Sequence, residues 1–184
     1  VQQQSSAFSF AIPTEFVELP SKGEFYPEGH PLSGVETVEI RHMTAKDEDI
    51  LTSQALVKKG VVLDRLLANV LIDKTIQIDS LLIGDKNALL KACRQYGYGA
   101  IYETKIPCPA CDTEVEYSFD ISKWKNSQSN IEEFGGERTE NNTFLITLHS
   151  SGVSAEFKIL TSFDEKRIEN LGKRSKKLKL PESY

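Results

Sequence analysis

The spacing of apolar residues changes once along this chain, at Gly97 and Gly99, and this change restricts the possible folds more than any other feature. Before the two glycines, apolar residues recur at the spacing of amphipathic helices. After them, short runs alternate between apolar and polar residues, which is typical of half-buried strands. The sequence therefore predicts an α+β domain, with a helical N-terminal half packed with antiparallel β-hairpins from the C-terminal half.

Helices are expected over most of the segment from Thr44 to Gly99, after an extended segment over 16–27 that Pro20, Gly23 and Pro27 keep from forming a long helix. Thr44 is a suitable N-cap, and Asp47 places a carboxylate at the positive end of a helix that Gly60 would end. A strand over 35–43 should lead into this helix. Further helices are expected over 61–71, from near Asp79, and from near Asp85 to Gly97. One face of the 61–71 helix would carry Leu63, Leu66, Leu67, Val70 and Leu71.

Two β-hairpins are expected in the C-terminal half. The segment between them, 126–142, is rich in Ser, Asn, Gly and Glu, which is typical of a surface loop with room for a short helix through Ile131 and Phe134. The strands are expected over 101–106 paired with 114–119, and over 144–148 paired with 155–160.

One stretch of the sequence occurs twice in similar form. Residues 39–48 match residues 156–165 in kind at eight of ten positions, and each stretch runs from an alternating strand into Thr-x-x-Asp. The match indicates either a pseudo-repeat with two similar docking edges or the ordinary chemistry of a strand-to-helix junction. Both interpretations predict that Thr44 and Thr161 are N-caps.

The two ends differ from the rest in composition. Residues 1–15 are rich in Gln and Ser, and their alternating Phe8, Phe10 and Ile12 would suit either a mobile terminus or strand addition to a partner. The last nineteen residues carry a net charge of +5, against about −10 for the first 165. We expect an extended or disordered arm (1–15), one α+β domain (16–172) and a basic tail (173–184). Within the domain, 16–100 would hold the wrap, a strand and the helices, and 101–172 would hold the β-hairpins and a final helix.

Cys108 and Cys111 are the clearest candidates for chemistry, because Cys-Pro-Ala-Cys at the tip of a hairpin has the spacing of half a zinc site. The other half would come from Cys93 with His30, His42 or His149, or from a partner chain. A redox pair and a metal-free tip are the alternatives. Three cysteines in all favour a reducing compartment over a disulfide framework.

Other function classes find little support. The sequence contains no nucleophile elbow, phosphate-binding loop or His-Glu-x-x-His pattern, so we do not expect an enzyme. The acidic body argues against nucleic-acid binding, although a half zinc-ribbon module remains an alternative. No apolar run reaches the length of a membrane span, and we expect a soluble intracellular product.

Short motifs follow one another in a fixed order between Phe16 and Trp124. They are Leu19-Pro20-Ser21-Lys22-Gly23, Tyr26-Pro27, Met43-Thr44 with Asp47-Glu48, Gly84-Asp85, Arg94 with Tyr96-Gly97, and Cys108-Pro109-Ala110-Cys111. In this combination the chain resembles the baseplate hub subunit and hub assembly family of T4-like contractile-tailed bacteriophages.

The resemblance implies a structural or assembly role, not catalysis. It implies contacts with other baseplate or tail proteins, assembly in the host cytoplasm, and a place in the tail baseplate of the virion. A transient tail assembly chaperone that is absent from the mature particle is the alternative within the same class.

Overall fold

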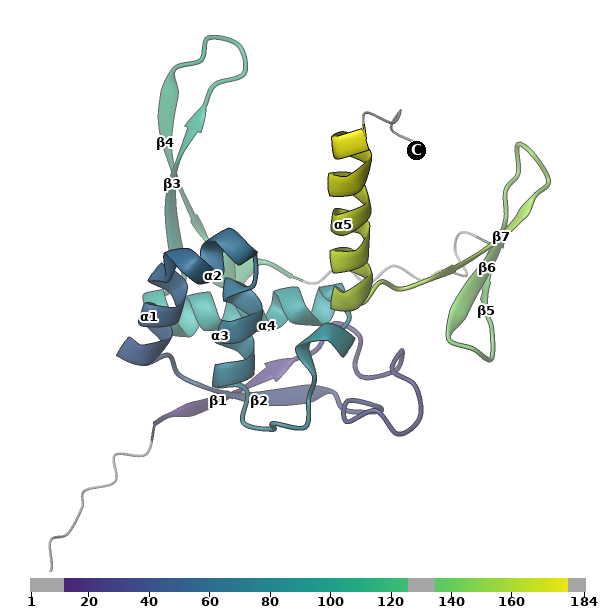
Figure 1. Cartoon of the computed structure of the whole chain (residues 1–184), viewed down its shortest axis with the longest axis horizontal. Helices are drawn as coiled ribbons and strands as arrows, with labels where there is room; N and C mark the ends of the chain where they lie inside the picture. The colour runs from purple at the N-terminus through teal and green to yellow at the C-terminus, as the bar shows by residue number, and fades with distance from the viewer. Residues whose placement is uncertain (1–11, 126–134, 179–184) are drawn as a thin grey trace, which may run out of the picture.

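The computed structural model describes residues 12–125 and 135–178, and its helices and small antiparallel sheets confirm the α+β prediction (Figure 1). None of the described helices has the length and apolar character that crossing a bilayer requires. The elements are β1 (Thr14–Glu18), β2 (Thr37–Arg41), α1 (Ala45–Thr52), α2 (Gln54–Lys59), α3 (Val62–Val70), the 3-10 turn η1 (Ile78–Ser80), α4 (Ile83–Tyr98), β3 (Ile101–Pro107), β4 (Glu114–Asp120), the 3-10 turn η2 (Ile121–Lys123), β5 (Gly136–Arg138), β6 (Thr143–Thr147), β7 (Ser154–Lys158) and α5 (Ser162–Leu178).

The hydrophobic core lies within the N-terminal half, which we call the body (residues 14–98). Strands β1 and β2 form an antiparallel pair, and helices α3 and α4 pack with them. The core cluster extends from Val17 to Cys93 and includes the apolar face of α3. Among the described hydrophobic residues after Cys93, only Ile121 and Phe144 are buried. The C-terminal half therefore adds little to the core.

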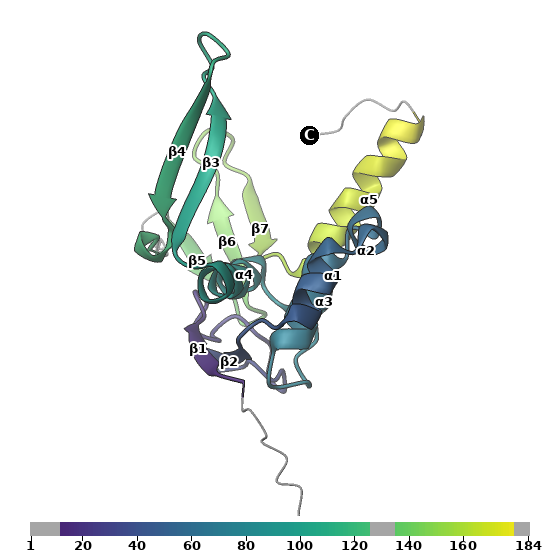
Figure 2. The same ribbon diagram turned by 90° about the vertical axis from the view of Figure 1, so that its left-hand side faces the viewer.

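Three projections extend away from the body: hairpin β3–β4 and helix α5 rise above it in Figure 1, and the β5-β6-β7 sheet lies to its right (Figures 1 and 2). The first is the hairpin β3–β4, and the second is the three-stranded sheet in the order β5-β6-β7. The third is helix α5. Among the described residues, the contacts of the projections with the body lie at their bases, and many of their large apolar side chains are exposed.

The expected helix from Thr44 to Gly60 is two helices, α1 and α2, because the backbone of Ser53 is extended. The carbonyl of Ser53 accepts the N–H groups of Leu56 and Val57 and so starts a new helix. Serine favours such positions because its side chain competes for backbone hydrogen bonds. Gly60 ends α2 in the left-handed conformation, as expected.

Other differences concern single elements. The helix expected near Asp79 is only the turn η1, and Leu63 is 46% exposed although the other four residues expected on its face are buried. Strand β5 lies within the segment expected to be a loop. The final helix continues to Leu178, beyond the expected boundary at 172, and β1 begins at Thr14, inside the expected arm. The helix suggested through Ile131 and Phe134 lies outside the described residues.

Candidate protein-contact surfaces

Asp85 joins the N-terminal wrap (residues 16–27) to helix α4 and is fully buried. Its carboxylate accepts hydrogen bonds from the Ser21 hydroxyl (2.6 Å), the Ser21 backbone N–H (3.0 Å) and the Tyr26 hydroxyl (2.8 Å). The Tyr26 oxygen accepts the N–H of Leu82 at 3.1 Å. A buried carboxylate needs such donors to offset its lost hydration. Three of the motifs that carry the family resemblance therefore meet at one joint.

Asp47 forms a second buried joint, between β2, α1 and α3. Both of its oxygens accept from the Arg41 guanidinium, at 2.7 and 2.9 Å. The Thr44 N–H and hydroxyl donate at 2.7 and 2.8 Å, and the Asn69 amide donates at 2.6 Å. Burial alone would raise the pKa of Asp47, but these donors outweigh burial and hold its pKa well below the usual range.

The depressed pKa of Asp47 predicts a loss of stability in acid. A carboxylate with a lower pKa in the folded state stabilises the fold above its unfolded pKa, about 4, and this contribution is lost as the pH falls toward the folded pKa. The free energy of unfolding, measured by urea titration between pH 7 and pH 3, should therefore decrease below about pH 4. In Asp47→Asn the decrease should be shallower, and an unchanged slope in that variant would contradict this assignment.

The same joint occurs where β7 leads into α5, so the predicted N-cap roles of Thr44 and Thr161 are both confirmed. Asp164 accepts from the Thr161 hydroxyl at 2.8 Å and from Lys158 at 2.9 Å. Lys158 stands six residues before Asp164, as Arg41 stands six before Asp47. The bond from Lys158 helps to lower the pKa of Asp164 to about 2. Unlike Arg41, Lys158 is largely exposed, so the second joint lies at the surface.

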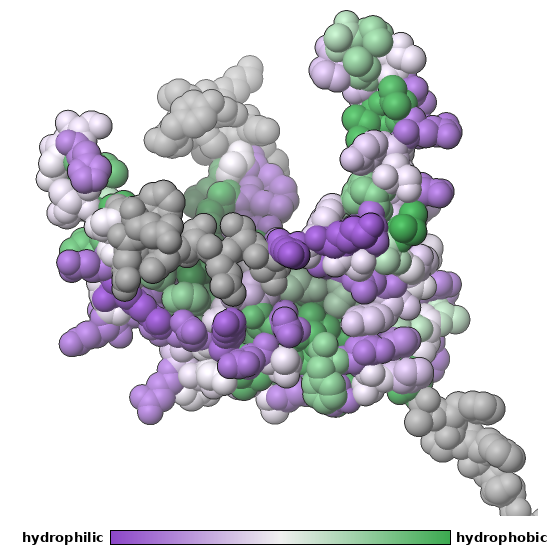
Figure 3. All heavy atoms as spheres, turned by 180° about the vertical axis from the view of Figure 1, so that it is seen from behind, coloured by the Kyte–Doolittle hydropathy of each residue, from purple (hydrophilic) through white to green (hydrophobic). Residues whose placement is uncertain are grey.

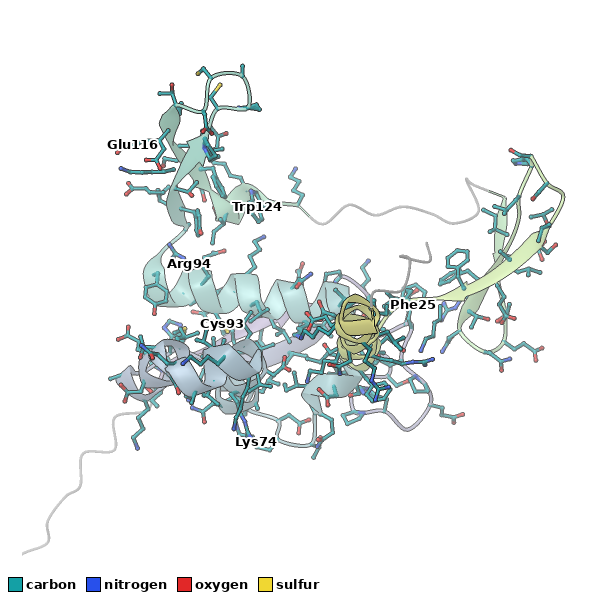
Figure 4. The ribbon with its side chains drawn as sticks, turned by 45° about the horizontal axis from the view of Figure 1, so that its top comes forward. Phe25, Lys74, Cys93, Arg94, Glu116 and Trp124 are labelled. Atoms are coloured by element: carbon teal, nitrogen blue, oxygen red, sulfur yellow. The ribbon has the colours of Figure 1, made fainter. Side chains whose placement is uncertain are left out.

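Basic side chains connect the base of each projection to the body. Arg94 of α4 donates to the carbonyl of Gly99 and lies over the rings of Tyr98 and Tyr102 at the foot of hairpin β3–β4. Figure 4 shows this position, with Trp124 beside the hairpin. Arg138 lies over Phe25, whose ring packs on Phe144 of the sheet.

Helix α5 is held by charges and by backbone hydrogen bonds near its first turn. Lys166 pairs with Asp64 at 2.6 Å and with Asp79 at 2.5 Å. Lys86 pairs with the same Asp64 at 2.9 Å. The Ser162 N–H donates to Leu81, which ties the start of α5 to the segment before α4. These contacts fix the base of the helix, and residues 167–174 beyond it are exposed.

The hairpin β3–β4 has one apolar face, which we call the hairpin stripe: Tyr102, Ile106, Val115, Tyr117 and Phe119. The pairing register places these five side chains on the same face and puts Glu103, Lys105, Glu114 and Glu116 on the other. Tyr117 is 55% exposed, and the neighbouring Trp124, which stacks on Phe119 at 5.3 Å, is 57% exposed. Figure 3 shows apolar residues along this hairpin from behind. An exposed apolar face on an isolated hairpin indicates a protein contact.

Helix α5 carries a second exposed surface, with apolar and basic residues together. A groove of about 840 Å³ runs along it, with Phe163 and Leu171 as its apolar lining. Its polar lining comprises Asp79, Asn170 and the basic Lys166, Arg167, Lys173 and Arg174, of which Lys166 already pairs with Asp79. A groove with this lining suits an acidic protein segment that also presents an apolar side chain.

The alternation of apolar and polar residues in β3 and β4 was the sequence signal for the hairpin stripe, but it did not reveal that the apolar face of this hairpin is exposed.

The structure separates Cys93 from the other two cysteines. Cys93 is buried in the core on α4, where burial raises the pKa of its thiol to about 11. Cys108 and Cys111 lie in the turn at the hairpin tip, and among the described residues no group of three or more His, Cys, Asp or Glu side chains is placed to hold a metal ion. Of the residues expected to bind a partner, Ile12 is exposed just before β1, and Phe8 and Phe10 lie outside the described residues.

The histidines are likewise apart from the tip. His30 bonds to Ser80 and stacks on Tyr26, and burial lowers its pKa. His42 pairs with Glu15 at 3.3 Å. His149 lies in the turn between β6 and β7. They therefore occupy three separate sites on the body and the sheet.

A stable body with projecting apolar and basic surfaces defines a class of protein that works by contacting other proteins. Comparison with known families gives the particular case: the family model of the T4 bacteriophage base plate protein matches residues 12–181, and the chain belongs to this family. Comparisons with curated proteins and with solved structures found no match. The resemblance inferred from the short motifs is thus confirmed at the level of a T4-like baseplate protein. The family implies a structural or assembly role in the phage tail and contacts with other baseplate proteins.

Proposed function

We propose that the protein is a structural or assembly component of the baseplate hub and acts through contacts made by its projections. The observation that carries this proposal is the hairpin stripe. A two-stranded hairpin is barely stable by itself in water, and its apolar face gains stability when a partner covers it. The basic groove of α5 offers a second contact of different chemistry. No catalytic role is part of this proposal.

The assignment to the hub rests on the order of the short motifs, from Leu19-Pro20 to Cys108-Pro109, within the baseplate family. The arm adds a further proposed contact, in which Phe8, Phe10 and Ile12 join the edge of a partner's sheet. The arm, the single domain and the basic tail are part of the same proposal.

A transient assembly chaperone is the second candidate, because exposed apolar surfaces also suit a protein that holds partners and then leaves. The two candidates differ in where the chain is found. Quantitative mass spectrometry of gradient-purified tails should detect the chain in a fixed ratio to other hub proteins. Its absence from tails, together with its presence in partly assembled hubs from the same infected cells, would favour the chaperone.

Substitutions in the hairpin stripe should weaken assembly and leave the fold intact. We choose Ile106→Thr with Tyr117→Thr, because threonine preserves strand propensity and both positions are exposed. Two lost contacts of about 1 kcal/mol each would reduce a binding constant roughly thirtyfold. The measurement is the yield of infectious phage when the variant replaces the native chain, with the melting temperature as a check on folding.

The matched control lies on the opposite face of the same hairpin. Glu103→Thr with Glu116→Thr alters two exposed positions and removes only a surface ion pair with Lys105, which contributes little. This variant should give a normal phage yield. Equal yields from the stripe variant and the control, with both proteins folded, would contradict the proposed role of the stripe.

A further inference from the structure

We propose that Cys108 and Cys111 form half of a zinc site, which the same two cysteines of a second copy complete. Two hairpin tips would then meet around one Zn²⁺ ion held by four thiolates. The inference concerns self-association through the tip and is independent of the assignment to the hub.

The turn that carries the cysteines is closed by backbone hydrogen bonds. The last pair of the hairpin is Pro107 with Glu114, and beyond it the Cys108 N–H donates to the Thr113 carbonyl at 2.9 Å. The Asp112 N–H donates to the Cys108 carbonyl at 2.8 Å. The backbone at Asp112 is left-handed, with φ of 57°, a conformation that aspartate tolerates better than most residues. The Cys111 thiol lies within hydrogen-bonding reach of Cys108 and donates to the Thr113 hydroxyl at 3.3 Å, so the turn places the two thiols together at the tip.

The site is incomplete within one chain. Zinc in a structural site takes about four ligands, usually thiolates and imidazoles in a tetrahedral arrangement. Cys93 is in the core, and the described histidines lie on the body and in the β6–β7 turn. Among the described residues, no third ligand stands beside the two cysteines. Any metal held at the tip needs ligands from another molecule.

A second copy fits the tip for two reasons. The tip stands clear of the body, so two hairpins can approach end to end (Figures 1 and 2). Ile106 and Val115 pair next to the turn, and both are exposed, so a two-fold contact would bury four apolar side chains around the metal. Asp112 and Glu114 bring negative charge to each tip, which repels a second tip until a cation is bound. The association should therefore depend on metal.

The test uses the full chain, reduced and freed of metal, to which ZnCl₂ is added. We expect about one zinc ion bound per two chains, as four thiolate ligands require, together with a doubling of the molar mass measured by light scattering after gel filtration. Cobalt in place of zinc should give the absorption bands of a tetrahedral thiolate complex. Cys108→Ser and Cys111→Ser should each abolish the metal-dependent change in mass.

Cys93→Ala is the matched control, because it removes a thiol that the proposal does not use, and it should bind zinc and dimerise like the native chain. Circular dichroism shows whether each variant is folded. Three results would overturn the proposal: no zinc bound by the native chain, about one zinc per monomer without a change in mass, or dimerisation that persists in Cys108→Ser. A disulfide formed between Cys108 and Cys111 despite reductant would also overturn it.

Discussion

Asp47→Ala should lower the free energy of unfolding by about 3–5 kcal/mol, because it leaves the Arg41 guanidinium without its partner in a mostly buried position. The substitution also removes the acceptor for Thr44 and Asn69, so β2, α1 and α3 lose their common joint. Denaturation by urea, followed by circular dichroism, gives the measurement. The effect should be among the largest of any single polar substitution in the body.

The similar cluster at the start of α5, around Asp164, supplies the matched control. Asp164→Ala removes the same kind of bond to Thr161, but its basic partner Lys158 is 56% exposed and remains hydrated. We expect a loss of about 1 kcal/mol, the usual contribution of a helix cap. Equal losses of stability from the two substitutions would show that the burial of Arg41 and Asp47 does not increase the contribution of their ion pair to the free energy of unfolding.

Gly23→Ala should destabilise the protein by several kcal/mol or prevent folding. Gly23 has φ of 75°, and a Cβ added there would lie 2.6 Å from the Leu32 carbonyl oxygen and 2.7 Å from that of Val35. Both neighbours are backbone atoms, so the chain cannot relieve the overlap by a rotamer change. The left-handed backbone alone costs roughly 1–2 kcal/mol for alanine, and the overlap adds to this cost. Expression of soluble protein and the thermal midpoint are the measurements.

Gly34 separates these two contributions. It has a similar φ of 71°, but nothing lies within 4 Å of an added Cβ. Gly34→Ala should therefore cost only the backbone term of roughly 1–2 kcal/mol. A similar loss in both variants would show that the close approach of the wrap to residues 32–35 is unimportant for stability.

Local chemistry predicted much of the fold. Thr44, Thr161, Gly60 and Gly99 mark helix ends because a cap depends on the residue itself and its nearest neighbours. The hairpins were predictable for the same reason, since alternation and turn residues act over short distances. The break at Ser53 was missed because a continuous helix and two short ones share the same apolar pattern.

Contacts between distant segments could not be predicted. Ser21 and Asp85 are 64 positions apart, and nothing in either segment alone indicates that they bond. The motifs around Ser21 and Asp85 suggested a family, but only the structure shows that the residues of these motifs bond to one another. The placement of Cys93 in the core similarly depends on the packing of α4.

The candidate surfaces were only partly visible in the sequence. Alternation predicts the strands of hairpin β3–β4, but whether another element covers their apolar face depends on the tertiary arrangement. Tyr117 and Val115 were therefore expected in a packed hairpin, whereas the structure leaves them exposed. The cysteine pair was found by its spacing, which is a local property. The basic character of the last helix was also evident, although its apolar lining at Phe163 and Leu171 was not.

The end of the core cluster at Cys93 has a consequence for how the protein can change over evolutionary time. If the projections make the contacts proposed above, substitutions at their outer ends alter which surfaces the protein recognises and leave the packing of the body untouched. Folding and recognition would then be encoded by different residues. A phage lineage could adapt the protein to altered neighbours by drift in the outer segments while the same body persists.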